Sequence, residues 1–266
     1  MQNQQDITRR RPIITGVPFY LPVAVPFTGV VNESVTVYTT PGQRVGPLEI
    51  IGGVTDLETA EAQFTLDKRP LFSSENIPLV TKFGKPDGPK PIFRYQPPTE
   101  LNHRQRIRAD ILNVGGEGAG TFVFIGRQVG IEGPMVQALM DYQGQGAEDT
   151  IVLDSKFAGT ALNDITLNTT PVVDDDFIWK TLHTNLAGDA SVRISGIDGR
   201  SWMDDFVPLW ALAGRANSVL PNQTVDPLCF IPAGYQVSIE FKNEGVGGVA
   251  ATSGKVFLGG QRVPRR

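Results

Sequence analysis

Two stretches of the 266-residue sequence decide its fold, Ile107–Asn113 (IRADILN) and Val237–Asn243 (VSIEFKN). In both stretches the first, third and fifth residues are apolar, and the residues between them are polar. A period of two is typical of a β-strand that buries one face and exposes the other. The two stretches lie 130 residues apart and end on the same residue type. The sequence therefore predicts that one strand occurs twice in the chain.

The same spacing recurs elsewhere in the sequence. Val35–Pro41 (VTVYTTP) aligns with Ile165–Pro171 (ITLNTTP), and Ile77–Leu79 (IPL) aligns with Val207–Leu209 (VPL), both at an offset of 130. Two more pairs align at offsets of 131 and 133: Phe64–Arg69 with Ser195–Arg200, and Phe122–Gly126 with Lys255–Gly259. A register that holds through separate segments indicates an internal repeat.

Polar and turn residues fall in matching positions as well as apolar ones, and generic strand composition would not align them. The matching pairs are Asp67/Asp198, Arg69/Arg200, Pro78/Pro208 and Asn113/Asn243. We therefore predict two copies of one domain. The expected organisation is an N-terminal arm (1–16), a first β-sandwich (17–131), a linker (132–146) and a second β-sandwich with a basic C-terminal tail (147–266).

The composition predicts the fold class. The chain has 29 glycines and 20 prolines, with 40% hydrophobic and 20% charged residues. Frequent glycine and proline disfavour long helices and favour many short strands joined by turns. We expect an all-β protein with two tandem antiparallel β-sandwiches, either jelly-roll-like or immunoglobulin-like. The one helix-like run, Pro134–Tyr142, lies in the predicted linker.

The N-terminal segment superficially resembles a leader or a membrane span. Arg9–Arg11 precedes a stretch without charge, Pro12–Val31, but Pro18, Pro22 and Pro26 recur there every four residues. A helix would lose one hydrogen bond at each of these prolines. We predict an extended arm that leads into a first strand, with no processed leader.

Charge and rare residues exclude several classes of function. A net charge of −4 argues against nucleic-acid binding by the molecule as a whole. The single cysteine, Cys229, cannot form an internal disulfide, and the two histidines, His103 and His183, cannot make a three-histidine metal centre. Cys229 and both histidines are expected to have structural roles. We expect no enzyme activity and no catalytic, cofactor-binding or metal site.

Two motifs have both a chemical and a structural interpretation. Gly245–Ala250 matches a dinucleotide fingerprint, which needs a helix after it. Here the strand-like Lys255–Leu258 follows instead, so a hairpin loop is the better interpretation. The run Asp174, Asp175 and Asp176 either offers oxygen ligands to calcium or lies in a solvated loop, and both interpretations stay open.

Other residues carry hypotheses about contacts. Arg69 and Arg200 are either structural turn partners or members of an inter-subunit salt bridge. Trp179, Trp202 and Trp210 all lie in the second copy, and the last two are expected at core positions. The basic ends, Arg9–Arg11 and Pro264–Arg266, are either solvated tails or segments that reach a phosphate-rich surface or a neighbouring subunit.

Taken with the uncharged proline-rich arm, the tandem β-sandwiches of about 115 residues resemble bacteriophage virion structural proteins. The nearest family is the double jelly-roll capsid proteins of the PRD1–adenovirus lineage. The resemblance implies a structural subunit located in the virion of a double-stranded DNA phage. It also implies a homotrimer whose six similar sandwiches form a pseudo-hexagonal block, in contact with other virion proteins and without cofactor or small-molecule substrate. The alternatives are a head decoration, collar or adsorption protein that binds virion proteins or a glycan, and a hydrolase on a β-sandwich scaffold.

Overall fold

A computed structural model describes most of the chain. The described residues are 16–41, 48–85, 93–102, 104–129, 147–155, 165–170, 172, 174–184, 190–195, 203, 205–213, 229–244 and 254–263. The predicted arm up to residue 15, the predicted linker and the basic C-terminal residues 264–266 lie outside these ranges. So do the helix-like run Pro134–Tyr142 and the glycine-rich motif Gly245–Ala250.

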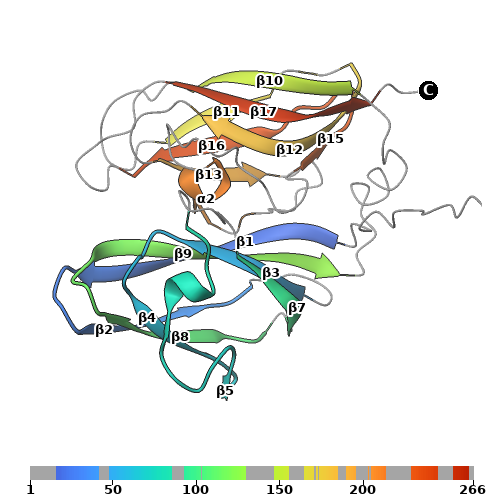
Figure 1. The fold of residues 1–266 in the computed structure, drawn as a ribbon. Coiled ribbons are helices and arrows are strands. Elements are labelled where there is room, and N and C mark those ends of the chain that lie inside the picture. The colour runs from blue at the N-terminus through green and yellow to red at the C-terminus, as the bar shows by residue number, and fades with distance from the viewer. Residues whose placement is uncertain are drawn as a thin grey trace, which may run out of the picture.

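Two antiparallel sheets form the first sandwich (Figure 1). The first has the order β1 (Gly16–Thr28), β9 (Gly118–Val129), β3 (Leu48–Thr55), β7 (Phe93–Leu101). The second has the order β2 (Glu33–Thr39), β8 (Ile107–Asn113), β4 (Glu61–Leu66), β5 (Arg69–Pro70). A short strand, β6 (Ile77–Pro78), also pairs with β4, and a single 3₁₀ turn, η1 (Leu79–Thr81), follows it.

The second sandwich repeats this arrangement. One sheet has the order β10 (Ala147–Ser155), β17 (Gly254–Val263), β12 (Asp176–Thr184), β15 (Cys229–Ile231). The other has the order β11 (Ile165–Thr169), β16 (Ser238–Asn243), β13 (Ala190–Ser195), β14 (Val207–Pro208), and a short helix, α2 (Leu209–Ala213), follows β14.

The prediction of an all-β sandwich fold is confirmed. In each sandwich the first strand pairs with the last one, and the second strand pairs with the last but one. This order is that of a jelly roll and not of an immunoglobulin fold. The short helix that the structure does describe, α2, belongs to the second sandwich and not to the predicted linker.

Pairing registers also correspond between the two sandwiches. Ala62 faces Ile77 in the β4–β6 pair, and the residues 130 positions later, Val192 and Val207, face each other in the β13–β14 pair. A β-bulge interrupts β3 at Ile51, and another interrupts β12 at Lys180. A bulge changes the direction of the side chains beyond it. A bulge on corresponding strands of the two sandwiches is therefore a detailed similarity between them.

Some of the alignments predicted from sequence are wrong by one residue. Phe64 faces Ala109, while Ile194 faces Ile239, so Phe64 corresponds to Ile194 and not to Ser195. Counting from the two bulges, Phe124 likewise corresponds to Leu258 and not to Phe257. A shift of one residue exchanges the inward-facing and outward-facing positions of a strand. The sequence alignment missed this shift because it was anchored on matching turn residues beside the strands.

Figure 1 shows the four sheets stacked, with the β1–β9–β3–β7 sheet turned toward the second sandwich. Its inner face contributes Phe19, Phe122 and Phe124 to the first core. Within that core the rings of Phe64, Phe83, Phe122 and Phe124 pack at centroid distances of 5.2 to 5.9 Å. Four of these six ring pairs are edge-on, and edge-on packing adds to the free energy gained from burial.

The proline-rich segment is the edge strand β1 itself and not an arm that precedes a strand. Pro18, Pro22 and Pro26 all occupy even positions, and residues two apart in a strand point their N–H groups the same way. Because proline has no N–H, these positions must face away from β9. Pro18 and Pro22 therefore remove donors from the free edge of β1 and stay in register with β9, whereas Pro26 lies where the register shifts, between Val25 and Thr28.

Two glycines on β9 allow a test of core packing. A Cβ at Gly126 would overlap the Phe19 ring, whereas a Cβ at Gly118 would meet nothing within 4 Å. We expect Gly126→Ala to lower the free energy of unfolding by about 1–3 kcal/mol through overpacking. The matched control Gly118→Ala should leave it unchanged or raise it by up to about 1 kcal/mol. Urea unfolding measures both, and equal effects would contradict this account.

Candidate functional site at the junction of the two sandwiches

The outer face of the β1–β9–β3 sheet is apolar and covered. Tyr20, Ile51, Val54, Val123 and Ile125 point away from the first core and are at most 9% exposed. They belong to the same apolar cluster as the core of the second sandwich. The two cores therefore meet through a sheet that is apolar on both faces.

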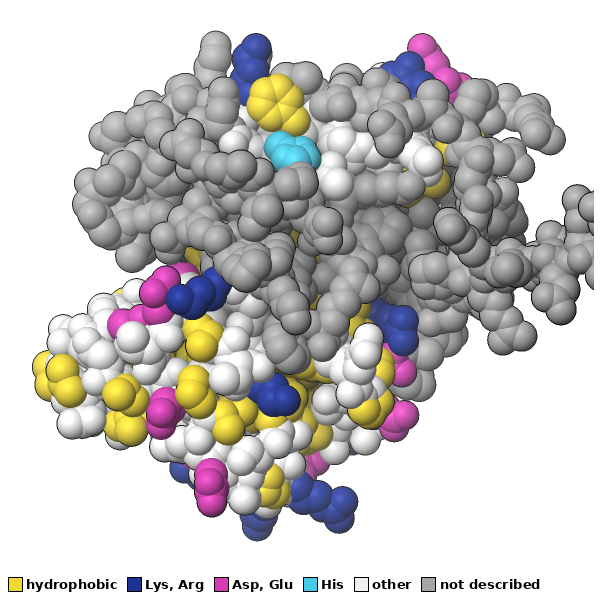
Figure 2. Space-filling model, in the orientation of Figure 1, with side chains coloured by type: hydrophobic (Ala, Val, Ile, Leu, Met, Phe, Trp, Pro, Cys, Tyr) yellow, Lys and Arg dark blue, Asp and Glu magenta, His cyan; other side chains and the backbone are white. Residues whose placement is uncertain are grey.

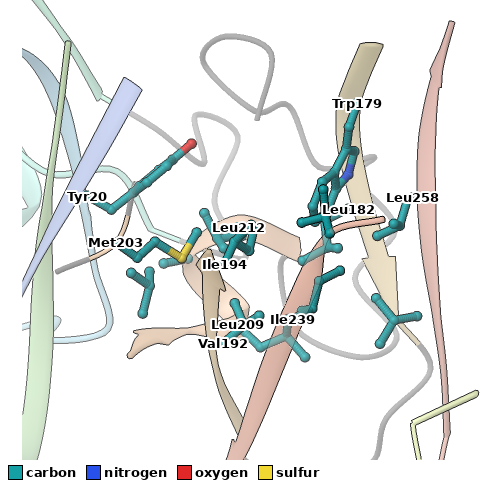
Figure 3. Packing of buried hydrophobic residues seen from close by; sticks show 14 of the residues in the cluster. Tyr20, Trp179, Leu182, Val192, Ile194, Met203, Leu209, Leu212, Ile239 and Leu258 are labelled. Carbon is teal, nitrogen blue, oxygen red and sulfur yellow. The ribbon is translucent and has the colours of Figure 1, made fainter. Parts of the chain in front are cut away.

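The second sandwich contributes the segment around β14 and α2 to this contact. Met203 is 1% exposed, and a parallel bridge joins it to Tyr20 on the free edge of β1. Figure 3 shows Met203 lying between Tyr20 and the residues Leu212 and Ile194. Leu209 and Leu212 on α2 complete the cluster. Among the described residues, the even-numbered position of β1 that pairs with the second sandwich is thus a tyrosine, which keeps its N–H.

A cleft of about 650 Å³ opens beside this contact. Its first wall comes from β1 and from the β3–β4 and β8–β9 loops, and its second wall comes from β13, β14 and the end of β16. Phe206 and Trp210 supply aromatic surface. The charged lining residues are Asp56, Glu117, Asp205, Glu244 and Lys242. Four carboxylates against one ammonium make the lining acidic.

Several of these carboxylates hold the cleft in shape. Glu117 Oε1 accepts hydrogen bonds from the backbone N–H groups of Glu58 (2.6 Å) and Thr59 (3.1 Å). Asp56 Oδ1 accepts one from the Thr121 N–H (2.7 Å), and Glu244 lies 3.3 Å from Lys242 Nζ. Charge-assisted bonds of this kind order loops, so the acidic lining is partly structural.

An ion pair lies beside the cleft on the outer face of the second sandwich. Arg193 Nε donates to Glu240 Oε2 at 2.6 Å, and the guanidinium stands 4.7 Å from the Phe206 ring centroid. The hydrogen bond to Glu240 raises the pKa of Arg193, so this residue stays charged at any accessible pH. Stacking on a cation fixes the Phe206 ring at the cleft wall.

The corresponding face of the first sandwich carries a similar cluster. Asp110 accepts hydrogen bonds from Thr36 Oγ1 (2.6 Å) and Arg108 Nη2 (2.8 Å), and it lies 130 residues before Glu240. Burial acts to raise the pKa of Asp110, but these hydrogen bonds and the Arg108 charge outweigh it and hold the pKa below its ordinary value. Asp110 is half-buried. Figure 2 shows Lys, Arg, Asp and Glu side chains distributed among apolar and other side chains over the visible face of the first sandwich.

The run Asp174–Asp176, for which calcium binding was one of two open interpretations, is divided between the surface and the interior. Asp174 is exposed, whereas Asp176 is 4% exposed and accepts a hydrogen bond from the Ala233 N–H at 2.8 Å. Within the described ranges no three His, Cys, Asp or Glu side chains are grouped so as to hold a metal ion. Asp176 instead ties the start of β12 to the residues that follow β15.

Of the two matching arginines, Arg69 and Arg200, the structure describes Arg69. Asp67 and Lys68 both have positive φ (48° and 69°) and form a two-residue hairpin turn. Asp67 Oδ2 accepts a hydrogen bond from Gln105 Nε2 at 2.8 Å, and Arg69 is exposed. Asp198 and Arg200 lie outside the described residues, so the inter-subunit salt bridge stays a prediction.

The other singled-out residues are dispersed. Trp179 is fully buried and donates to the Thr181 carbonyl at 2.7 Å, whereas Trp210 is partly buried at the cleft. His183 is half-buried on β12, and Cys229 begins β15. His103 and Trp202 lie outside the described residues. Of the described helices, none is long and apolar enough to cross a membrane.

Sequence patterns did not single out Tyr20, Met203 or Phe206 as junction residues. One signal was present, because Phe122–Ile125 (FVFI) is apolar at every position rather than at alternate ones. A strand with that pattern is buried on both faces. It could have shown that β9 lies between two cores.

Comparisons with known proteins give distant similarities only. No family model matches the sequence, and no curated protein matches it. Among solved structures, a xanthan lyase from Paenibacillus is similar over 93% of this chain at 10% identity, with a TM-score of 0.25. The chain spans 27% of that lyase. The STIV MCP is similar over 93% of this chain and 96% of its own length, at 9% identity and a TM-score of 0.25.

Asp110 gives the fold a pH dependence whose sign follows from its depressed pKa. The stabilisation by the Asp110 carboxylate should be complete above about pH 4, the ordinary pKa of an aspartate in the unfolded chain. It should disappear as the pH falls through the lower pKa of Asp110 in the folded chain. Near neutral pH we expect the free energy of unfolding of the wild type to exceed that of Asp110→Asn by no more than about 1 kcal/mol, because the Arg108–Asp110 ion pair is partly exposed. Urea unfolding from pH 7 to pH 2 measures this. Thr36→Val should move the loss to higher pH, and a difference independent of pH would contradict the account.

Val123 tests whether the junction couples the sandwiches. It is fully buried on the outer face of β9, so an aspartate there would be an unpaired buried charge. We expect Val123→Asp to lower the free energy of unfolding by about 3–5 kcal/mol. Val30→Asp, at a valine that is 59% exposed, should change it by less than about 0.5 kcal/mol. Urea unfolding followed by tryptophan fluorescence separates the two cases, and similar losses would show that the junction contributes little.

Proposed function

We propose that this chain is a structural subunit of a virion, a capsid protein built by internal duplication of one jelly-roll domain. One observation carries the proposal: the two sandwiches have the same strand order and matching details of pairing. The β4–β6 pair of the first corresponds to the β13–β14 pair of the second, and the corresponding strands β3 and β12 each contain a bulge. The resemblance of the sequence to double jelly-roll capsid proteins supports the same conclusion.

Duplicated sandwiches suit a building block for a physical reason. The contact between them joins different faces, the outer sheet of the first and the β14–α2 side of the second. A contact between unlike faces of like units can be repeated, and it generates a ring if the rotation closes. The finer form of the proposal is a pseudo-hexagonal trimer in a double-stranded DNA bacteriophage, with residues 1–15 reaching neighbouring subunits.

The proposal predicts self-assembly. We expect the purified protein to sediment as an oligomer at micromolar concentration and to show a hexagonal outline in negatively stained images. Removing residues 1–15, which precede β1, should impair particle formation while the circular dichroism of the remaining chain stays unchanged. A monomer at these concentrations, with an arm that is dispensable for particle formation, would overturn the proposal.

The cleft favours a second candidate, a decoration, collar or adsorption protein. Phe206 and Trp210 beside Asp56 and Asp205 give aromatic surface with flanking hydrogen-bond acceptors, a combination suited to a glycan. This candidate predicts binding to a glycan or a capsid surface without lattice formation. Glycan arrays and pull-down on virus particles distinguish it from the first.

A further inference from the structure

Each of the two faces that meet at the junction has a counterpart on the other sandwich. Pro208 and Trp210 lie on the β14–α2 side of the second sandwich, where they line the cleft beside the junction, and the residues 130 positions earlier are Pro78 and Val80 on the first. The registers of β6 and β14 establish this correspondence. Pro78 is exposed and Val80 is half-buried. The β6–η1 side of the first sandwich is therefore the same face as the one that docks within the chain.

The complementary face also occurs twice. Within the chain, the docked sheet presents the cross-strand pair Val54 and Val123, which are 1% and 0% exposed. Counting from the bulges of β3 and β12, the corresponding cross-strand pair in the second sandwich is His183 and Phe257. Both of these side chains are half-buried. An aromatic side chain thus stands on the outer face of β17 where the first sandwich has a covered valine.

We propose that these two faces bind each other between copies of this chain. The β6–η1 face of one copy, with Pro78 and Val80, docks on the outer face of the β10–β17–β12 sheet of a second copy, around His183 and Phe257. The inference rests on the proposed function and gives it an interface. Each contact between chains then repeats the geometry of the contact inside the chain.

The free edge of β10 supports this assignment. At the edge of the docked sheet, β1 has lost N–H donors at three prolines and uses Tyr20 to bridge Met203. The corresponding edge strand β10 contains no proline (AEDTIVLDS) and pairs only with β17 among the described strands, so its other edge keeps every N–H. A strand edge with its donors intact can pair with a segment of another chain.

The experiment uses one arginine on each face of the full-length chain. We expect Val80→Arg and Phe257→Arg each to convert the assembled protein to a 28.9 kDa monomer in sedimentation velocity. The matched controls Val30→Arg and Tyr235→Arg place the same charge at apolar residues that are 59% and 53% exposed elsewhere. They should assemble as wild type does. Circular dichroism confirms that each variant is folded, and Pro78→Arg, at an exposed residue, replaces Val80→Arg if the latter unfolds.

Mixing the two variants gives the decisive result. Each variant keeps one native face, and these native faces are complementary, so an equimolar mixture should form dimers and nothing larger. A mixture that stays monomeric, or variants that assemble as wild type does, would overturn the proposed interface. In the second case the protein still self-assembles and the proposed function stands. If wild type itself is monomeric, the proposed function fails instead.

Discussion

The structure depends on a single sheet that is apolar on both faces. In β9 the alternate residues Phe122 and Phe124 belong to the first core, while Val123 and Ile125 belong to the cluster shared with the second. Neither set can be exposed without placing a large apolar surface in water, which a monomeric sandwich does not tolerate well. The hydrophobic effect that folds the first sandwich thus also requires the second sandwich to cover it.

Burying a sheet face near its edge creates a second constraint, because backbone donors on the edge must be paired or removed. Pro18, Pro22 and Pro26 remove three of them, and Tyr20 pairs through its bridge to Met203. Pro18 and Pro22 do not interrupt the ladder with β9, because they stand where the N–H would point outward, and Pro26 lies at the register shift between Val25 and Thr28. The same residues that argued against a helix in the sequence are therefore what make β1 a satisfactory edge strand.

Sequence patterns predicted the strands, the fold class and the correspondence of Ile77–Leu79 with Val207–Leu209. They failed on register at Phe64 and Phe124, because matching aspartates and glycines in turns outweighed the side-chain alternation of the strands. The sheet face to which a side chain points depends on cross-strand partners that are distant in sequence, such as Leu21 with Phe124 and Ile151 with Leu258. A single sequence does not reveal these partners. The junction was missed for the same reason, since Tyr20 and Met203 meet only after both sandwiches have folded.

The two equivalent faces differ in polarity in a direction that assembly requires. The face covered inside the chain carries Val54 and Val123, and its partner is always present because it is covalently attached. The corresponding face of the second sandwich carries His183 and Phe257, which are half-buried in the single chain, and in the proposed interface only another copy covers them fully. A fully apolar face there would cause unspecific association, whereas a mixed face binds more weakly and allows misplaced subunits to dissociate. A valine pair in the contact within the chain, and a histidine–phenylalanine pair in the proposed contact between chains, fit these two different requirements.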